Sequence, residues 1–136
     1  QASVLRVVNI KEGTVHTFYF FADLFQDKPI DLRMIIVALS DTHGNHRAVD
    51  VPQGDIIIHC GDITRKSNTE EVADFIRWFA GLNFQYKILV AGNHDRFIRK
   101  KKPEFLELAR SHNISYLENT SIQINGYSIF GSPFSL

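Results

Sequence analysis

Three short apolar runs, separated by helix-like stretches, constrain the fold of this chain more than any other feature of its sequence. The runs are Met34–Leu39, Ile56–Ile58 and Lys87–Ala91, and they are rich in branched residues. A short apolar run without alternating polar residues is typical of a strand that is buried on both faces of a sheet. Strands that alternate with helices predict an α/β fold with right-handed crossover connections.

The stretches between and after these runs carry helix and turn signals. Residues 69–80 have Thr69 as a candidate N-cap and glutamates in the first turn, and their apolar residues fall on one stripe: Val72, Phe75, Ile76 and Phe79. Gly81 is expected to stop this helix, and a second helix is predicted from Pro103 to about Ser111. Three more strands are predicted over residues 115–117, 121–124 and 127–130, with Asn125-Gly126 as the turn of a hairpin.

Residues 1–33 break the alternating pattern. Residues 4–10 and 15–21 could form an extra hairpin, whose neighbouring aromatics would pack on the domain. The alternative is a non-native extension, because the only methionine, Met34, opens the first apolar run and would be the natural start. Both interpretations stay open, and residues 34–136 are taken as the domain proper.

Composition excludes several classes of protein. Fifteen Lys and Arg balance fifteen Asp and Glu, so no charge excess points to nucleic acid or to a membrane surface as a partner. A single cysteine, Cys60, cannot form an internal disulfide, which argues against a stapled secreted scaffold and for a reducing compartment. No stretch is apolar for long enough to span a bilayer. A cytoplasmic location without a membrane partner is therefore expected.

Polar side chains of the kind that bind metals follow each of the first three predicted strands. Ser40–His46 follows the first strand, Gly61-Asp62 follows the second, and Gly92-Asn93-His94-Asp95 follows the third. Sites in open α/β sheets form at the carboxyl ends of the strands, so these three segments are expected to converge.

The residue types fit a pair of divalent ions. Asp41 and His43 are one residue apart and could hold one ion through oxygen and nitrogen, Asp62 could bridge two ions, and the amide oxygen of Asn93 suits Mn, Fe or Zn. Two ions about 3.5–4 Å apart would stabilise the attacking and leaving oxygens of a phosphoryl displacement and would lower the pKa of bound water, so that hydroxide forms near neutral pH.

The three motifs, in this order, resemble the calcineurin-like metallophosphoesterase superfamily. Ser-Asp-Thr-His, the run His59–Thr64 and Gly131-Ser132-Pro133 resemble its metallophosphoesterase-domain-containing subgroup. The resemblance implies that Asp41 and His43 bind the first metal, that Asp62 bridges and that Asn93 binds the second. It also implies that His94 acts beside the substrate phosphate and that Asp95 orients His94.

The implied activity is the hydrolysis of a small phosphomonoester or phosphodiester, with a nucleotide among the candidates, by a hydroxide that two metal ions activate. The implied fold is half of a layered α/β sandwich of the metallophosphoesterase type, with a mixed sheet, crossover helices and a C-terminal hairpin. The superfamily completes its site with later histidines in Gly-His and Gly-His-x-His contexts, whereas after His94 this sequence contains only His112, in a Ser-His-Asn context. Residues 34–136 are therefore expected to be the N-terminal half of such a domain.

The rival hypothesis is a non-catalytic fragment or interaction module that binds at most one metal weakly. In that case the sheet would lack a partner layer, so exposed apolar surface and association through it are expected.

Several other residues have a simpler interpretation. His46 is interpreted as a solvated loop residue, while His59 either supports the metal ligands or is hydrogen-bonded beneath the site. Cys60 is expected to be a buried small hydrophobe. A basic cluster could steer phosphate towards the site but is more simply a solvated face before a helix; it comprises Arg96, Arg99, Lys100, Lys101 and Lys102.

Overall fold

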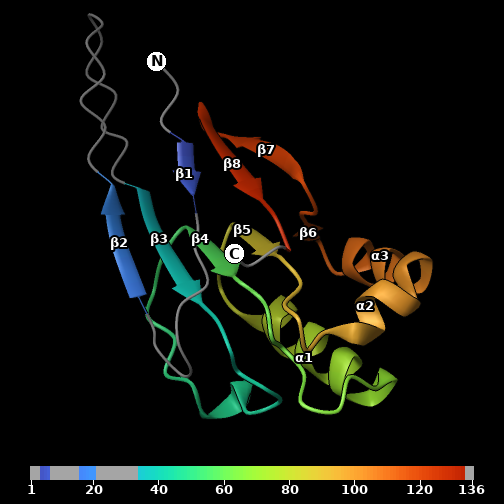
Figure 1. The fold of residues 1–136 in the computed structure, drawn as a ribbon. Coiled ribbons are helices and arrows are strands. Elements are labelled where there is room, and N and C mark those ends of the chain that lie inside the picture. Colours follow the sequence, from blue (N-terminus) through green and yellow to red (C-terminus); the bar gives the residue numbers. More distant parts are fainter. Residues whose placement is uncertain (1–3, 7–15, 21–33, 134–136) are drawn as a thin grey trace, which may run out of the picture.

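The computed structural model describes residues 4–6, 16–20 and 34–133, and a five-stranded sheet forms its centre (Figure 1). The strand order is β2-β3-β4-β5-β6. The bounds are His16–Phe20 for β2, Met34–Leu39 for β3, Ile56–His59 for β4, Tyr86–Leu89 for β5 and Ile114–Tyr116 for β6. Strands β3 to β6 are parallel, and β2 is antiparallel to β3. The predicted α/β class and its parallel sheet are confirmed.

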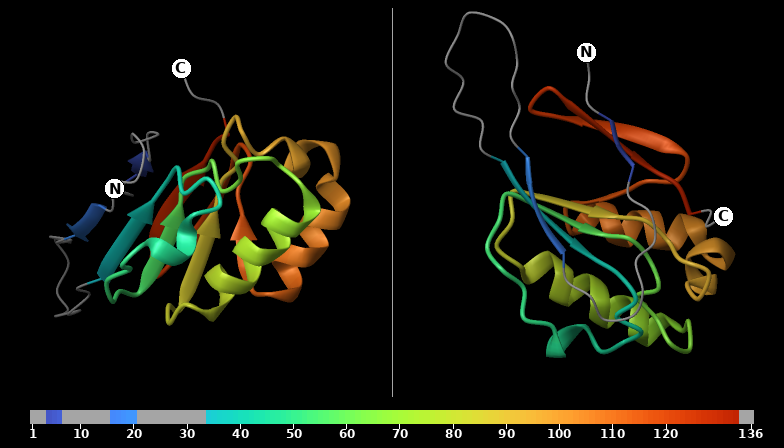
Figure 2. Two further views of the ribbon diagram at one scale, coloured as in Figure 1. Left: turned by 90° about the horizontal axis from the view of Figure 1, so that it is seen from below. Right: turned by 60° about the vertical axis from the view of Figure 1, so that its left-hand side comes forward.

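Helices cover one face of this sheet (Figure 2). They are the short η1 (His46–Ala48), α1 (Thr69–Gly81), α2 (Arg96–Lys100) and α3 (Lys102–Ser111). The buried stripe of α1 packs with alternate strand residues in one core, which includes Val37, Ile57, Phe75, Phe79 and Leu89. The longest helix among the described residues is α1, and its 13 residues are too few to cross a bilayer.

Three details of the helices differ from the sequence prediction. The N-cap of α1 is Asn68, whose Oδ1 accepts the Glu71 amide at 2.9 Å, and Thr69 is the first helical residue. Asparagine at this position satisfies a free donor of the first turn. Gly81 is the last helical residue, and Leu82 is the C-cap. Part of the basic cluster forms the helix α2, which was not predicted.

A smaller sheet covers the other face of the large one. Its order is β1-β8-β7, with β1 at Val4–Arg6, β7 at Thr120–Ile124 and β8 at Tyr127–Gly131. The predicted hairpin is confirmed, because β7 and β8 are antiparallel and Asn125 and Gly126 have φ angles of 50° and 83° at the turn. Side chains of this hairpin close a second core with the opposite face of β3, β4 and β5; they include Ile124 and Ile129.

The first two strands do not pair with each other. β1 pairs with β8 in parallel, and β2 pairs with β3, so they belong to different sheets. A hairpin between residues 4–10 and 15–21 is therefore wrong for the described residues, and its predicted turn at 11–14 lies outside them. Long-range pairing of this kind leaves no local signal in the sequence, because it depends on which distant strand edge is free.

The described residues do not show the exposed apolar sheet surface that was expected. Both faces of the large sheet carry a buried core. Within residues 34–133, whose side chains the structure describes, Phe130 on β8 is the one large hydrophobic side chain that is exposed, at 44%. The hairpin β7–β8 supplies the partner layer that, under the rival hypothesis, the sheet was expected to lack.

Candidate metal centre

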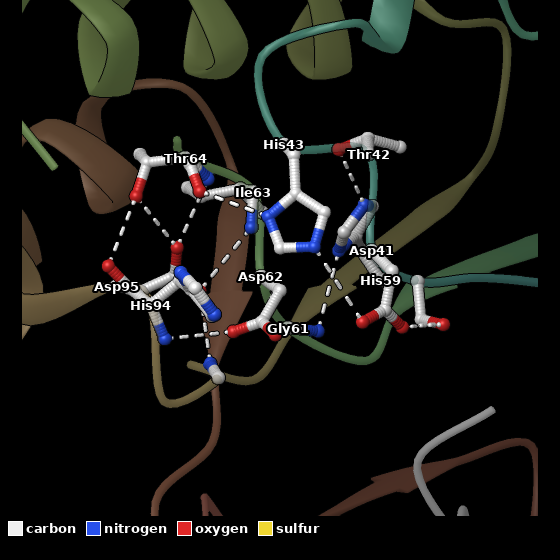
Figure 3. A network of polar contacts seen from close by, with 12 residues as sticks. Asp41, Thr42, His43, His59, Gly61, Asp62, Ile63, Thr64, His94 and Asp95 are labelled. Carbon is white, nitrogen blue, oxygen red and sulfur yellow. Dashed lines mark hydrogen bonds and ion pairs between the residues drawn. The ribbon is translucent and has the colours of Figure 1, made fainter. Parts of the chain in front are cut away.

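Three loops meet at the carboxyl ends of β3, β4 and β5 (Figure 3). Backbone hydrogen bonds continue past the strand ends: the amides of Asp41, His43 and Gly44 donate to the carbonyls of Gly61, Asp62 and Ile63, at 3.0, 2.9 and 2.9 Å. The loops after β3 and β4 therefore stay in register with each other. This register brings Asp41 and His43 alongside Asp62, as the strand-end argument predicted.

Asp41, His43 and Asp62 form a group that can hold a metal ion. Each offers a ligand atom, and these atoms lie within 4.8 Å of one another. His43 Nε2 is 3.8 Å from Asp41 Oδ1. Asp62 is buried, whereas Asp41 and His43 are half-buried, so the group opens to solvent on one side.

All three residues have left-handed backbone conformations. The φ angles are 56° for Asp41, 43° for His43 and 57° for Asp62. Residues other than glycine rarely adopt positive φ, and each such residue costs about 1–3 kcal/mol unless its surroundings hold it. The cross-loop hydrogen bonds hold these residues, so the three candidate ligands are among the non-glycine residues that the fold keeps at positive φ.

The His43 imidazole is oriented for metal binding. Its Nδ1 lies 3.2 Å from the carbonyl oxygen of Thr64. A carbonyl can only accept, so Nδ1 carries the proton and Nε2 keeps its lone pair. Thr64 had no assigned role in the sequence argument, although it closes the His59–Thr64 run.

Two glycines let the backbone approach Asp62 closely. A Cβ on Gly92 would lie 2.0 Å from Asp62 Oδ1, and a Cβ on Gly61 would lie 2.6 Å from the Gly92 nitrogen. Gly61 also has a φ angle of 109°, which favours glycine. The same Asp62 oxygen accepts the His94 amide at 2.9 Å, so the loop after β5 is tied to the central carboxylate.

Asp95 joins the two loops from below and does not hold the His94 ring. Its fully buried carboxylate accepts four hydrogen bonds, from the amides of Ile63, Thr64 and Gly92 and from the Thr64 hydroxyl, at 2.9–3.3 Å. Among the described residues none of its hydrogen bonds goes to the His94 imidazole. Burial raises the pKa of Asp95, and these hydrogen bonds oppose that shift. The expected role of Asp95 in orienting His94 is replaced by one in positioning the loops.

His94 and Asn93 occupy the exposed turn after β5. The His94 ring centroid is 5.0 Å from that of His43, and the two rings are at 81°. His94 therefore stands beside the candidate ligands on the open side of the group. Asn93 follows Gly92 in the same turn, and its part in metal binding stays a prediction.

His59 lies beneath the site. Gly61 donates its amide to His59 Nδ1 at 3.3 Å, so Nε2 carries the proton and donates to the Thr42 hydroxyl at 3.1 Å. Thr42 lies between Asp41 and His43, and this contact therefore anchors the first loop. His59 is fully buried, and burial lowers its pKa to about 3. The structure agrees with both interpretations of His59 from the sequence: it is hydrogen-bonded beneath the site, and through Thr42 it supports the loop that carries Asp41 and His43.

The depressed pKa of His59 predicts a pH dependence of stability. The unfolded chain takes up a proton on this histidine near pH 6.5, whereas the folded chain does so only near pH 3. The free energy of unfolding should therefore fall by about 1 kcal/mol per pH unit between pH 6 and 4. Urea denaturation at several pH values in this range measures the free energy of unfolding. This free energy should change less steeply with pH in His59→Gln than in the unmodified chain, and His112→Gln is the matched control. The same pH dependence in His59→Gln and the unmodified chain would contradict the assignment.

His46 and Cys60 complete the surroundings of the site. His46 is buried at 1% exposure rather than solvated: its Nε2 donates to Asp74 at 3.0 Å, and its ring packs against Phe75 and Trp78. Burial lowers its pKa. Cys60 is half-buried, not buried as expected. Its partial burial and the nearby Asp41 charge still raise the pKa of Cys60 to about 12, which agrees with an unreactive thiol.

The sequence matches one protein family and several known proteins. The profile of the calcineurin-like phosphoesterase family matches residues 34–133. The human metallophosphoesterase domain-containing protein 1 is 33% identical over 119 residues, covering 72% of this chain and 36% of that protein. A UPF0046 protein of Caenorhabditis elegans is 32% identical over 111 residues, covering 73% and 38%. The probable rhamnogalacturonate lyase C of Emericella nidulans is 34% identical over 117 residues, covering 79% of this chain and 11% of that protein. The chain thus spans little more than a third of the human and nematode relatives.

Proposed function

The chain belongs to the calcineurin-like phosphoesterase family, and on that premise we propose that it hydrolyses phosphate esters with divalent metal ions held at the ends of β3, β4 and β5. The substrate would be a small phosphomonoester or phosphodiester. The observation that carries this proposal is the convergence of Asp41, His43 and Asp62, whose ligand atoms lie within 4.8 Å of one another.

The residues present fit a metal ion in three respects. Carboxylate oxygens and an imidazole nitrogen suit Mn, Fe or Zn. The hydrogen bond from His43 Nδ1 to Thr64 leaves Nε2 free to bind. Asp62 Oδ1 accepts the His94 amide, while Oδ2 has no hydrogen-bond partner among the described residues and could serve as a ligand or, with Oδ1, as a bridge. Asn93 would contribute to a second ion.

The chain's own residues divide the chemical work. Bound divalent ions would supply Lewis-acid stabilisation of phosphate oxygens and a lowered pKa for water. His94 is exposed beside His43 and would contact the substrate phosphate, either stabilising its charge or protonating the leaving group. Thr64, His59 and Asp95 would keep the ligands in place without touching substrate.

The test is metal-dependent hydrolysis of aryl phosphate monoesters and diesters. We expect activity with Mn²⁺, its loss on chelation by EDTA, and its return when Mn²⁺ is added back. His94→Ala should lower kcat about 100-fold or more, because a positioned acid or charge stabiliser is lost. His112→Ala, at the end of α3, is the matched control and should change kcat less than twofold. Hydrolysis that persists in EDTA would refute the proposal.

A second candidate function is the binding of a single metal without hydrolysis. Asp41, His43 and Asp62 make up one group of metal-binding type among the described His, Cys, Asp and Glu residues, and one group suffices for one ion. Metal analysis of the purified chain separates the candidates. Two tightly bound ions per chain would favour hydrolysis, whereas a single ion without turnover would favour this alternative.

A further inference from the structure

Five exposed basic residues flank the metal centre and have no ion-pair partner among the described residues. Two lie in the loop after β4, and three lie on α2: Arg65, Lys66, Arg96, Arg99 and Lys100. We call them the cationic rim. The next two lysines differ, because Lys101 pairs with Glu104 and Lys102 pairs with Glu118. The rim therefore carries positive charge that the described carboxylates leave uncompensated.

Both parts of the rim are fixed to groups that surround the metal centre. Arg65 follows Thr64, whose carbonyl binds the His43 ring. The amide of Arg96 donates to the His94 carbonyl at 2.9 Å. The two segments also bind each other, because Phe97 donates its amide to Ser67 Oγ at 2.6 Å across 30 residues of sequence. The fold thus ties two separate basic segments together next to the site.

A neighbouring carboxylate, that of Glu71, binds the backbone of the rim. Glu71 accepts the amides of Arg65 and Lys66, at 3.3 and 2.8 Å, and so holds the loop in place. Within the described part of the chain, neither Glu71 oxygen pairs with a basic side chain of the rim. In a chain with fifteen cations and fifteen acidic residues, such a group of cations without ion-pair partners indicates an anionic ligand.

We propose that the cationic rim binds phosphate groups other than the one at the metal centre, so that the substrate is a small molecule with two or more phosphates. This inference deepens the proposed function and rests on it. A single phosphate at the metal centre would be neutralised there and would leave the rim unused. Three of the five rim residues are arginines, whose planar guanidinium groups match phosphate oxygens in pairs. Arg96, Arg99 and Lys100 are exposed, as the solvated-face interpretation expects, and the proposal adds phosphate binding to that face.

The test compares inorganic triphosphate with inorganic phosphate as probes. Both are titrated into the full chain at low salt and in EDTA, so that the metal centre does not contribute. The rim variant is Arg96→Gln with Arg99→Gln. The matched control is Arg77→Gln with Arg110→Gln, which removes two exposed arginines on α1 and α3. Calorimetry gives the affinities, and circular dichroism checks that each variant is folded.

We expect triphosphate to bind the unmodified chain at least tenfold more tightly than phosphate does. The rim variant should bind triphosphate about tenfold more weakly, and the control should change less than twofold. Arg65→Gln with Lys66→Gln, on the other segment, should reproduce the loss even if the first variant does not fold. Added salt should weaken binding, since the contacts are exposed.

Equal affinities for the two probes, or an unaltered affinity in both rim variants, would overturn the inference. Tighter binding of a short single-stranded oligonucleotide than of triphosphate, lost in the rim variants, would assign the rim to nucleic acid instead and would also overturn it. Metal stoichiometry is measured separately on the same samples. A chain that binds triphosphate at the rim but no Mn²⁺ would refute the proposed hydrolysis and the substrate assignment that rests on it, whereas metal binding without rim binding would refute this inference alone.

Discussion

Replacement of Asp62 by asparagine is expected to weaken Mn²⁺ binding by about 100-fold or more and to abolish metal-dependent hydrolysis. Loss of groups that merely support a ligand costs about 10–100-fold in metal affinity, so loss of the central carboxylate should cost at least as much. The substitution is well matched in shape. Asparagine keeps an oxygen that can accept the His94 amide at 2.9 Å, and only the charge and one ligand oxygen are lost.

Isothermal titration with Mn²⁺ measures this effect, and a urea titration shows whether the fold is kept. The control is Asp50→Asn, which removes the charge of an exposed aspartate outside the three candidate ligands. The control should bind Mn²⁺ as the unmodified chain does. Equal affinity and stoichiometry in Asp62→Asn would show that the metal ion binds elsewhere.

Replacement of Asp95 by asparagine is expected to lower the free energy of unfolding by about 2–4 kcal/mol. Both carboxylate oxygens accept hydrogen bonds: Oδ1 from the Thr64 amide and hydroxyl, and Oδ2 from the Ile63 and Gly92 amides. In either orientation, the asparagine NH₂ group would face donors in place of an acceptor. A buried donor that loses its partner costs about 1–3 kcal/mol.

The same substitution should weaken Mn²⁺ binding, because Asp95 ties the loop that carries Asp62 to the loop that carries His94. Urea denaturation gives the change in stability, and Asp50→Asn, which should change it by less than about 0.5 kcal/mol, again serves as the control. A fully stable Asp95→Asn variant would show that the network contributes little. Full stability together with lost metal binding would instead indicate a direct contact of Asp95 with the ion.

The strands were predictable because their signal is local. Six consecutive apolar residues at Met34–Leu39 provide no polar side chains for a solvent-exposed face, so a strand buried on both sides was the simplest interpretation. The turn at Asn125-Gly126 was equally clear, because few residue pairs tolerate two positive φ angles. The N-cap was misplaced by one residue, since Asn68 and Thr69 are both good caps and only the backbone decides between them.

The candidate ligands were predictable for a related reason. Their residue types stand at the ends of successive buried strands, and the parallel arrangement then requires the three segments to meet. The sequence could not assign Asp95 or His46 correctly. Their positions in the chain suit an exposed turn, yet both are buried, because partners 28 to 32 residues away lie against them.

The sequence by itself determined the α/β class, the parallel strands, the closing hairpin and the residue types at the metal centre, since each follows from local periodicity or from the position of a residue at a strand end. Only the tertiary structure decided that the Asp62 carboxylate lies with Asp41 and His43 whereas the Asp95 carboxylate joins loops, how the second face of the sheet is covered, and that two basic segments bind each other beside the site. The first and last of these outcomes depend on hydrogen bonds between loops that β4 and β5 hold side by side, and the second depends on the packing of the β7–β8 hairpin. Such bonds connect residues about 30 positions apart: backbone amides donate, and side-chain oxygens such as Asp95 Oδ1 and Ser67 Oγ accept. Because almost every residue offers a backbone amide, the local sequence does not show which amide a distant side chain will bind.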